Sequence, residues 1–117
     1  MAMFAFADAV AQGRPLTIYN GGGMARDFTF VGDVARGVVR ALEWRAAPGE
    51  EAQVFNIGAG RPTTLLDFIR TLERALGGVA ALKDGGSSAG EVASTFCDGA
   101  LARQVLGFEA AVGLDEG

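Results

Sequence analysis

The sequence predicts an α/β fold, in the form of an α+β-like fragment in which short strands alternate with about four helices. Two observations carry this prediction. Apolar residues recur at helical spacing in four stretches, and short β-branched or aromatic runs stand between those stretches. The 117 residues suffice for one compact domain and are too few for two. We therefore expect a single region over residues 1–117 instead of a helical bundle or a β-sandwich.

The N-terminal part is expected to form a helix followed by two strands. The helix spans about residues 2–12 and ends at Gly13, with Pro15 just beyond it. The runs L-T-I-Y and D-F-T-F-V are typical of strands. The glycines from Gly21 to Gly23 are expected to provide a loose connection between them.

A second helix is expected to run to about Arg45. Asp33 stands at its front edge, where an acidic side chain caps the helix or complements its dipole. The apolar stripe that is expected to face the core consists of Val31, Val34, Val38 and Leu42.

A third strand and a third helix are expected next. The alternation in Q-V-F-N-I-G predicts the strand over 53–58. The helix opens at Pro62, and Thr64 and Asp67 have the spacing of a capping box. Its buried face is expected to consist of Leu65, Ile69, Leu72 and Leu76.

The last third of the chain shows weaker signals. V-A-A-L-K predicts a short strand, D-G-G-S-S-A-G a flexible loop and E-V-A-S-T-F a further extended run. A fourth helix is expected to start at Asp98, to bury Leu101 and Val105, and to close at Gly107.

The composition excludes several classes of function. A net charge of −4 argues against a nucleic-acid partner, which would require clustered Lys and Arg. With one cysteine, Cys97, and no histidine, neither an internal disulfide nor a Cys/His zinc site can form. No apolar run reaches the roughly 18 to 20 residues of a transmembrane helix, and the N-terminus lacks the basic region of a signal peptide. We expect a soluble cytoplasmic protein with no membrane partner and no metal.

The chain also lacks the residues of common catalytic mechanisms. The only tyrosine, Tyr19, is followed four positions later by Gly23 and not by a lysine that could lower its pKa. The stretch I-G-A-G-R-P-T-T lacks the third glycine of a dinucleotide fingerprint and is interpreted as a tight turn. Cys97 is expected to pack, since nothing nearby would activate it. We expect no catalytic and no cofactor-binding residue in this chain.

Arg26 is the candidate for anion binding. A guanidinium beside a glycine loop suits a bidentate contact with a phosphate. The alternative, on spacing alone, is a surface arginine paired with Asp27 or Asp33.

The order of the motifs resembles a known family. R-D-F-T before an Asp-initiated helix, N-I-G at the end of a strand, and G-E-V followed by T-x-x-D are similar to the C-terminal part of extended short-chain dehydrogenase/reductases. Within them the chain resembles the NAD-dependent epimerase/dehydratase family, and UDP-glucuronate 4-epimerases most. The resemblance covers essentially the whole chain. It implies part of the substrate domain of a Rossmann-type enzyme, without the N-terminal coenzyme domain and the last helix.

The resemblance also implies roles for five residues. Arg26 falls where the family's arginine contacts the substrate diphosphate. Tyr19, with Thr17 beside it, falls where an aromatic residue packs against uracil. Ser88 stands where some members place a second diphosphate-binding arginine, and Glu91 where members carry aspartate.

The implied partners are a UDP-sugar and an N-terminal Rossmann domain that binds NAD, with no NAD bound by this chain alone. The complete relative is expected to epimerise C4 of the sugar and can be a homodimer. A nucleotide-sugar dehydratase, a non-catalytic binding or interaction module and a non-functional truncated remnant stay open as alternatives. The first helix has no strand before it, and G-L-D-E-G reads as the start of another element. Both features are expected of a piece of a larger protein, which would be catalytically incomplete.

Overall fold

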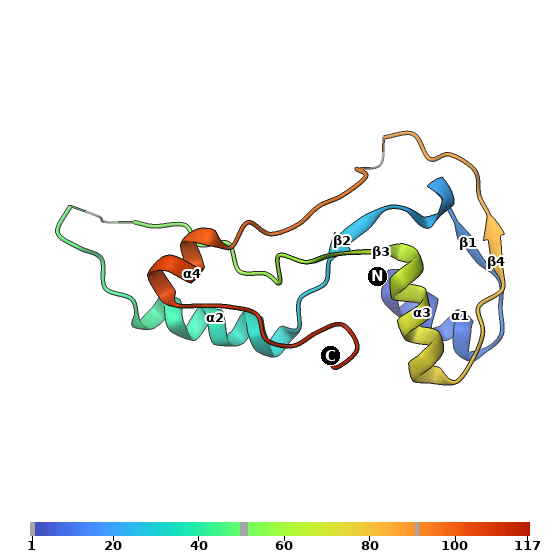
Figure 1. Ribbon diagram of the computed structural model, residues 1–117, viewed down its shortest axis with the longest axis horizontal. Helices are drawn as coiled ribbons and strands as arrows, with labels where there is room; N and C mark the ends of the chain where they lie inside the picture. The colour runs from blue at the N-terminus through green and yellow to red at the C-terminus, as the bar shows by residue number, and fades with distance from the viewer. Residues whose placement is uncertain (1, 50–51, 91) are drawn as a thin grey trace. The chain divides into compact units, whose positions relative to one another are not determined.

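The computed structural model describes residues 2–49, 52–90 and 92–117 (Figure 1). These residues contain four α-helices and short strands, two of which pair in parallel, and so the predicted fold class is confirmed. The chain divides into two compact units, each built from two separate segments. Unit 1 consists of Met1–Arg26 and Thr63–Thr95, and unit 2 of Asp27–Pro62 and Phe96–Gly117.

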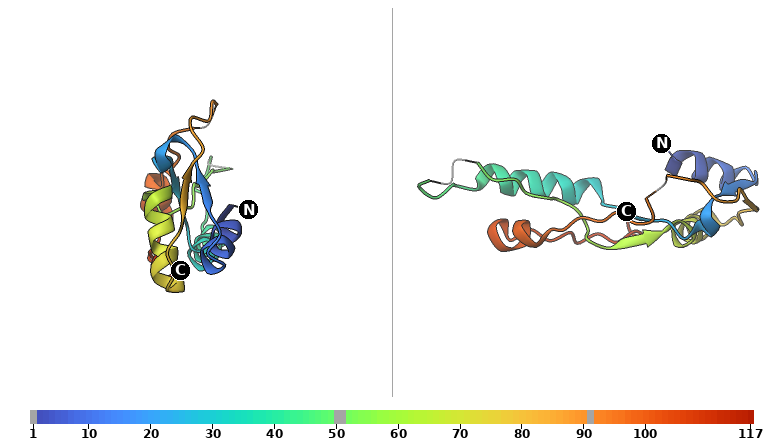
Figure 2. Two further views of the ribbon diagram at one scale, coloured as in Figure 1. Left: turned by 90° about the vertical axis from the view of Figure 1, so that its right-hand side faces the viewer. Right: turned by 90° about the horizontal axis from the view of Figure 1, so that it is seen from above.

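Unit 1 contains two helices and a parallel pair of strands. The strand β1 (Leu16–Ile18) pairs with β4 (Leu82–Asp84), so that they lie side by side (Figure 2, left). The helices α1 (Ala2–Ala11) and α3 (Leu65–Leu76) contact one another. The buried apolar side chains of this core are those of Ala9, Val10, Leu16, Ile18 and Ile69.

In unit 1, the end of α1 and the cap of α3 follow the prediction, whereas the start of α3 does not. The helix α1 stops before Gly13, which has a positive φ of 63°. At the start of α3, the Thr64 hydroxyl accepts the Asp67 amide at 3.1 Å and donates to the Asp67 carboxylate at 2.7 Å, which caps the first turn. The prediction that Pro62 opens this helix is wrong, since it lies in the strand β3 (Pro62–Thr64). The side chains that α3 buries fully are Phe68 and Ile69, whereas Leu76 is exposed.

The glycines after β1 form an ordered turn, which corrects the expectation of a loose connection. Residues Asn20–Gly22 make one 3-10 turn, η1, and a Cβ on Gly22 would lie 2.7 Å from Leu66 Cγ. The next strand, β2, is Ala25–Asp27, earlier than predicted. It pairs with β3, and Ala25 also forms a bridge with Ser94. The aromatic run after it is not a strand, because the Phe30 carbonyl already accepts the first amides of a helix.

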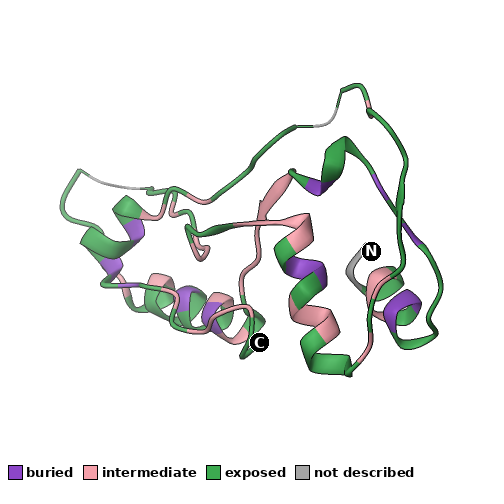
Figure 3. Ribbon diagram, turned by 45° about the vertical axis from the view of Figure 1, so that its right-hand side comes forward, coloured by how far each residue is buried: buried purple, intermediate pink, exposed green. Residues whose placement is uncertain are grey.

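In unit 2, the helix α2 (Val31–Glu43) buries a different face from the predicted one. The inward positions are Asp33, Gly37 and Ala41, spaced by four residues. A Cβ on Gly37 would lie only 2.8 Å from Ile57 Cγ2, so the close packing requires glycine. Most of the helix is exposed (Figure 3). In the predicted stripe, the exposed fractions are 74% for Val31, 50% for Val38 and 74% for Leu42.

Asp33 is not the N-cap of α2, because Phe30 occupies that position. Its buried carboxylate accepts the amides of Ala111 and Val112, both at 2.9 Å, and pairs with Arg36 at 2.7 Å. The Val112 amide holds the pKa of Asp33 below its ordinary value, with the Ala111 amide and Arg36 acting in the same direction and burial opposing them. Asp33 therefore fastens the C-terminal segment to α2.

The predicted strand over 53–58 is also absent. Phe55 and Ile57 pack against the apolar cluster of α4 (Ala100–Leu106), whose buried members are Ala102, Leu106 and the following Phe108. Val54, which alternation would place on a sheet face, is largely exposed. Within the described residues no strand pairs with this segment, so its extended backbone lacks the ladder that defines a strand.

The fourth helix begins at Ala100 and not at Asp98, whose carboxylate accepts the Ala100 amide at 3.0 Å. Leu101 and Val105, predicted to be buried, are exposed. The helix closes at Gly107 as predicted, with a positive φ of 60°.

The last strand of unit 1, β4, lies slightly later than predicted. The loop after it, up to Gly90, contains no helix or strand, and the described residues 92–96 of the run E-V-A-S-T-F contribute one bridge, at Ser94. None of the helices in the described part of the chain is long and apolar enough to cross a bilayer.

Candidate functional site

The predicted substrate residues of unit 1 gather where β1 and β4 end. Thr17 points outward from β1. Tyr19 is the first residue after this strand, and 44% of its surface is exposed. A Cβ on Gly85, the residue after β4, would lie 2.6 Å from Tyr19 Cε1 and 2.7 Å from Thr17 Cγ2. The bare backbone of Gly85 therefore makes close contact with both side chains.

Ser88 belongs to the same place. The parallel ladder continues beyond β4, because the Gly85 amide donates to the Ile18 carbonyl at 2.7 Å and the Asn20 amide to the Gly86 carbonyl at 2.9 Å. The Ser88 amide then donates to the Asn20 side-chain oxygen at 3.1 Å. We call Thr17, Tyr19, Gly85 and Ser88 the Tyr19 edge.

Arg26 is held by backbone carbonyl groups. Its Nη1 donates to Val92 at 2.9 Å and to Ala25 at 2.7 Å. Neither Asp27 nor Asp33 pairs with it among the described residues, so the alternative of a simple ion pair is not observed. The Nε and Nη2 groups have no hydrogen-bond partner among the described residues, which leaves one side of the planar guanidinium for a bidentate contact.

One segment of chain links Arg26 to the Tyr19 edge. Residues 82–88 lie along β1 and Asn20, and residues 92–95 lie along β2, where the Ala25 amide donates to the Ala93 carbonyl at 2.8 Å. The structure thus brings Thr17, Tyr19 and Ser88 together and connects them to Arg26 through this segment. Glu91, the fifth predicted residue, lies outside the described residues.

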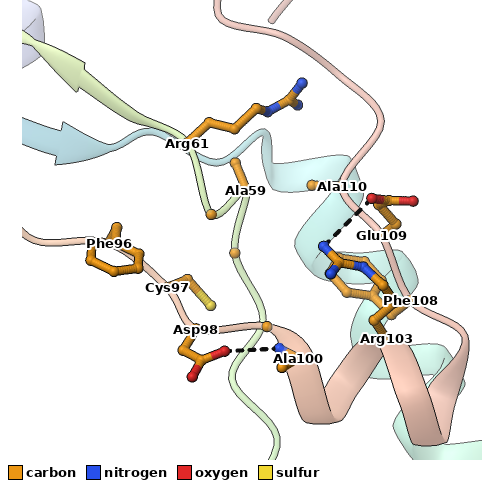
Figure 4. A pocket seen from close by; sticks show the side chains of 13 residues that line it. Ala59, Arg61, Phe96, Cys97, Asp98, Ala100, Arg103, Phe108, Glu109 and Ala110 are labelled. Carbon is orange, nitrogen blue, oxygen red and sulfur yellow. Dashed lines mark hydrogen bonds and ion pairs between the residues drawn. The ribbon is translucent and has the colours of Figure 1, made fainter.

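Unit 2 contains a separate cavity of about 290 Å³ (Figure 4). Its walls come from the turn 58–61, the segment 96–100 and the region around α4, including Arg103, Phe108, Glu109 and Ala110. Arg103 and Glu109, on the same wall, form an ion pair at 3.5 Å.

Asp27 holds two of these walls. One of its carboxylate oxygens accepts the amides of Gly60 and Cys97, both at 2.8 Å. A Cβ on Gly58 would lie 2.4 Å from the Cβ of Cys97, so only glycine fits this turn. Burial raises the pKa of the Cys97 thiol, and the negative charges of Asp27 and Asp98 raise it further. A thiol that stays protonated is a poor nucleophile.

The amides of the Gly58–Gly60 turn are already occupied. Ala59 donates to the Thr29 hydroxyl at 3.1 Å, and Gly60 donates to Asp27. This turn therefore does not fit the pyrophosphate of a dinucleotide, which needs free amides. Among the described residues, no group of three or more His, Cys, Asp or Glu side chains could hold a metal ion.

Three residues of these sites were missed in the sequence, namely Asn20, Asp27 and Gly85. Asn20 precedes three glycines, which is typical of a turn with positive φ, so a signal was present. The roles of Asp27 and Gly85 depend on contacts with distant segments, and nothing local indicates them.

The comparisons with known proteins agree on one family. Residues 1–58 match the model of the NAD dependent epimerase/dehydratase family. A protein of Rhizobium meliloti (strain 1021) named "Probable UDP-glucuronate 4-epimerase" is 35% identical, over 100% of this chain and 39% of that protein.

Two solved structures give the same picture. The UDP-glucuronic acid 4-epimerase of Bacillus cereus, in complex with UDP-glucuronic acid and NAD, is 33% identical with a TM-score of 0.87, over 100% of this chain and 37% of that one. The UDP-glucose 4-epimerase of Thermotoga maritima, with UDP-glucose, is 29% identical with a TM-score of 0.85, over 100% and 36%. The chain thus spans well under half the length of each of these relatives.

Proposed function

This chain belongs to the NAD-dependent epimerase/dehydratase family, and on that premise we propose that it supplies the UDP-sugar-binding part of a sugar-nucleotide epimerase of the UDP-glucuronate 4-epimerase type. The observation that carries the proposal is the link between the Tyr19 edge and Arg26. One segment contacts both, so an aromatic surface and a guanidinium are presented by the same small unit. A nucleotide diphosphate requires this combination of groups.

In the proposed complex, Tyr19 and Thr17 of the Tyr19 edge bind the uracil ring. The half-exposed Tyr19 ring is backed by the Gly85 backbone, and it offers a flat apolar face. Stacking of a base on an aromatic side chain contributes about 1–3 kcal/mol. The exposed Thr17 hydroxyl can donate or accept a hydrogen bond at the rim of the base.

Arg26 binds the diphosphate in this proposal. Because Nη1 is anchored on two carbonyl oxygens, the guanidinium plane is fixed before the ligand arrives. The Nε and Nη2 side is then available for two parallel, charge-assisted hydrogen bonds. Ser88 would contribute a hydroxyl near the diphosphate, and Glu91 stays in the proposed site through its place in the family motif.

The hydride transfer belongs to a further domain in this account. The solved relatives named above include a complex with NAD, but the glycine turn of this chain does not fit a pyrophosphate. We therefore assign coenzyme binding and catalysis to a Rossmann domain that works with this chain, and we propose that the complete enzyme forms a homodimer. The exposed apolar stripe of α2 and the unpaired segment 52–57 support the proposal that unit 2 packs against that domain.

Titration of the 117-residue chain with UDP, followed by amide NMR, tests the proposed function. AMP serves as the control ligand, since it lacks uracil and carries one phosphate. We expect UDP-selective shifts around Tyr19 and Arg26, and loss of about tenfold or more in UDP affinity in Arg26→Ala. Arg45→Ala is the matched control, because Arg45 is an exposed arginine whose partners among the described residues are carbonyl groups at the end of α2. Equal responses to UDP and AMP would contradict the proposal.

A further inference from the structure

Asn20 has an unusual backbone conformation. It is the one non-glycine residue with a positive φ, 51°, in the part of the chain that the structure describes. A side chain makes this left-handed region unfavourable, and asparagine is among the few residues that tolerate it. Residues held in such conformations concentrate at binding sites, where the surrounding contacts enforce them.

The contacts of Asn20 join two segments that are distant in the sequence. Its backbone amide donates to the Gly86 carbonyl at 2.9 Å, and its side-chain oxygen accepts the Ser88 amide at 3.1 Å. The side-chain nitrogen lies 3.7 Å from the Met24 sulfur. The side chain of Asn20 therefore extends the hydrogen bonding between residues 85–88 and the end of β1 by one contact beyond the last backbone pair.

The fastened segment forms one wall of the Tyr19 edge. Gly85 touches the Tyr19 ring and the Thr17 methyl, and Ser88 is bonded to the residue that follows Tyr19. Residues 85–87 are exposed and lie outside the helices and strands. Gly85 and Gly86 are held by their backbone bonds to Ile18 and Asn20 and by the Asp84 carboxylate, which accepts the Gly86 amide at 2.8 Å. The Asn20 side chain adds the bond that holds Ser88. If the segment swings away, the Tyr19 ring loses its support and Ser88 leaves the site.

We propose that Asn20 is a positioning residue for nucleotide binding. Its side-chain hydrogen bond with the Ser88 amide, which we call the latch, holds residues 85–88 against the end of β1 and so fixes the Tyr19 ring and Ser88 before the ligand arrives. This inference rests on the proposed function, because it assigns the Tyr19 edge to the uracil side of a UDP-sugar. Asn20 touches no ligand in this account. It lowers the entropic cost of binding by ordering the groups that do.

A purely structural role would have a different signature from a positioning role. The fold of unit 1 rests on the cluster of α1, β1 and α3, which Asn20 does not join. Loss of the latch should therefore change the order of residues 85–88 and the affinity for the nucleotide, with little change in Tm.

Asn20→Gly isolates the latch. Glycine accepts the positive φ and keeps the backbone hydrogen bond to Gly86, so only the side-chain contacts are lost. Asn20→Asp is the conservative variant, since a carboxylate accepts the Ser88 amide and aspartate also tolerates this conformation. Gly23→Ala is the matched control in the same loop, because Gly23 has a negative φ of −78° and the nearest atom to its Cβ would be 3.7 Å away.

The first readout needs no ligand. Hydrogen exchange of the Ser88 amide and the NOE between Gly85 Hα and the Tyr19 ring report on the latch directly. In Asn20→Gly we expect exchange to be roughly tenfold faster and the NOE to weaken, with both restored in Asn20→Asp. Unchanged exchange and NOE in Asn20→Gly would overturn the latch itself.

The second readout is affinity, measured with UDP and with uridine. For Asn20→Gly we expect roughly a three- to tenfold weaker affinity for both probes, with the wild-type value in Gly23→Ala. For Asn20→Asp the uridine affinity should be restored, since uridine carries no phosphate to repel the carboxylate. A loosened segment with unchanged affinity would overturn the positioning role and leave the proposed function standing. A wild-type chain that binds neither probe would overturn the proposed function, and with it the role of Asn20.

Discussion

Gly85 lies so close to the Tyr19 ring that a Cβ at this position would stand 2.6 Å from Tyr19 Cε1. Such a separation is well inside van der Waals contact, so any other residue displaces the ring or the segment that carries it. The orientation of the only tyrosine in the chain thus depends on a glycine 66 positions later in the sequence.

Gly85→Ala is therefore expected to weaken UDP binding. The added methyl group moves the Tyr19 ring from its support, and stacking on the base is lost in part. We expect a loss of roughly five- to tenfold in affinity, measured by isothermal titration calorimetry. Gly23→Ala, which has room for the methyl group, should bind as the wild type does. Equal affinity in the two variants would show that the Tyr19 ring is not part of the site.

Asp33→Asn is expected to destabilise unit 2 in a pH-dependent way. The pKa of Asp33 in the folded chain lies below its ordinary value of 3.8, chiefly because of the Val112 amide. A depressed carboxyl pKa stabilises the folded state above the unfolded-state pKa, and this contribution is lost as the pH falls below about 3.8. At pH 6 we expect a Tm lower than that of the wild type by on the order of 5–10 °C, and the difference should close below pH 3.8.

Asp8→Asn is the control for this measurement. Asp8 forms an exposed ion pair with Arg14, and such pairs contribute little. Its Tm should stay within about 2 °C of the wild-type value across the same pH range. A Tm difference for Asp33→Asn that does not begin to narrow as the pH falls below about 3.8 would contradict a depressed pKa of Asp33 in the folded chain.

Cys97 is expected to react slowly with iodoacetamide. Burial, together with the carboxylates of Asp27 and Asp98, raises the pKa of its thiol above the ordinary 9.0, so the midpoint of the rate against pH should lie above that value. Asp98→Asn removes one of these charges and should accelerate alkylation at pH 8 by roughly two- to fivefold. Asp8→Asn removes a charge elsewhere and should leave the rate unchanged. A midpoint below pH 8 would mean that the cavity of unit 2 activates the thiol.

Leu42→Gln is expected to change association without changing stability. Leu42 is 74% exposed on the apolar stripe of α2, so the substitution removes no buried contact. We expect the Tm to stay within about 2 °C, while ANS fluorescence and self-association in sedimentation experiments decrease. Phe68→Ala, in the buried core of unit 1, is the contrasting variant and should lower the Tm strongly. A large loss of stability in Leu42→Gln would show that the stripe is buried in the chain itself.

The C-terminal ends of α1 and α4 and the Thr64 cap of α3 were predictable because they depend on neighbouring residues. Gly13 and Gly107 end helices through a positive φ, and the Thr64 hydroxyl caps α3 through a residue three positions away. In each case the interaction lies within one turn of the chain, so the local sequence determines it.

The buried face of α2 could not be predicted in the same way. Apolar spacing identifies a stripe, but it does not say what the stripe meets. Here Gly37 allows a closer approach than a valine would, and Asp33 binds two backbone amides of the C-terminal segment. The strand predicted over 53–58 was wrong for a related reason. A segment of alternating polar and apolar residues forms a strand only when a neighbouring strand pairs with it.

The residues of the candidate site were predictable by type but not by arrangement. Arg26 and Tyr19 stood out in the sequence because of their chemistry and their family positions. Their supports are the Val92 carbonyl for Arg26 and Gly85 for Tyr19, and both come from a segment more than 60 positions away. The parallel pairing of β1 with β4 brings Gly85 into place, and the bridge between Ala25 and Ser94 does the same for Val92.

Intermolecular NOEs between UDP and the 117-residue chain test whether uracil binds at the Tyr19 edge. We expect NOEs from uracil H5 and H6 to the Tyr19 ring and to the Thr17 methyl group at saturating UDP. NOEs from the uracil protons to Phe96 or Phe108, which line the cavity of unit 2, would contradict this placement. Saturating UDP that gives no NOE to Tyr19 or Thr17 would contradict it equally.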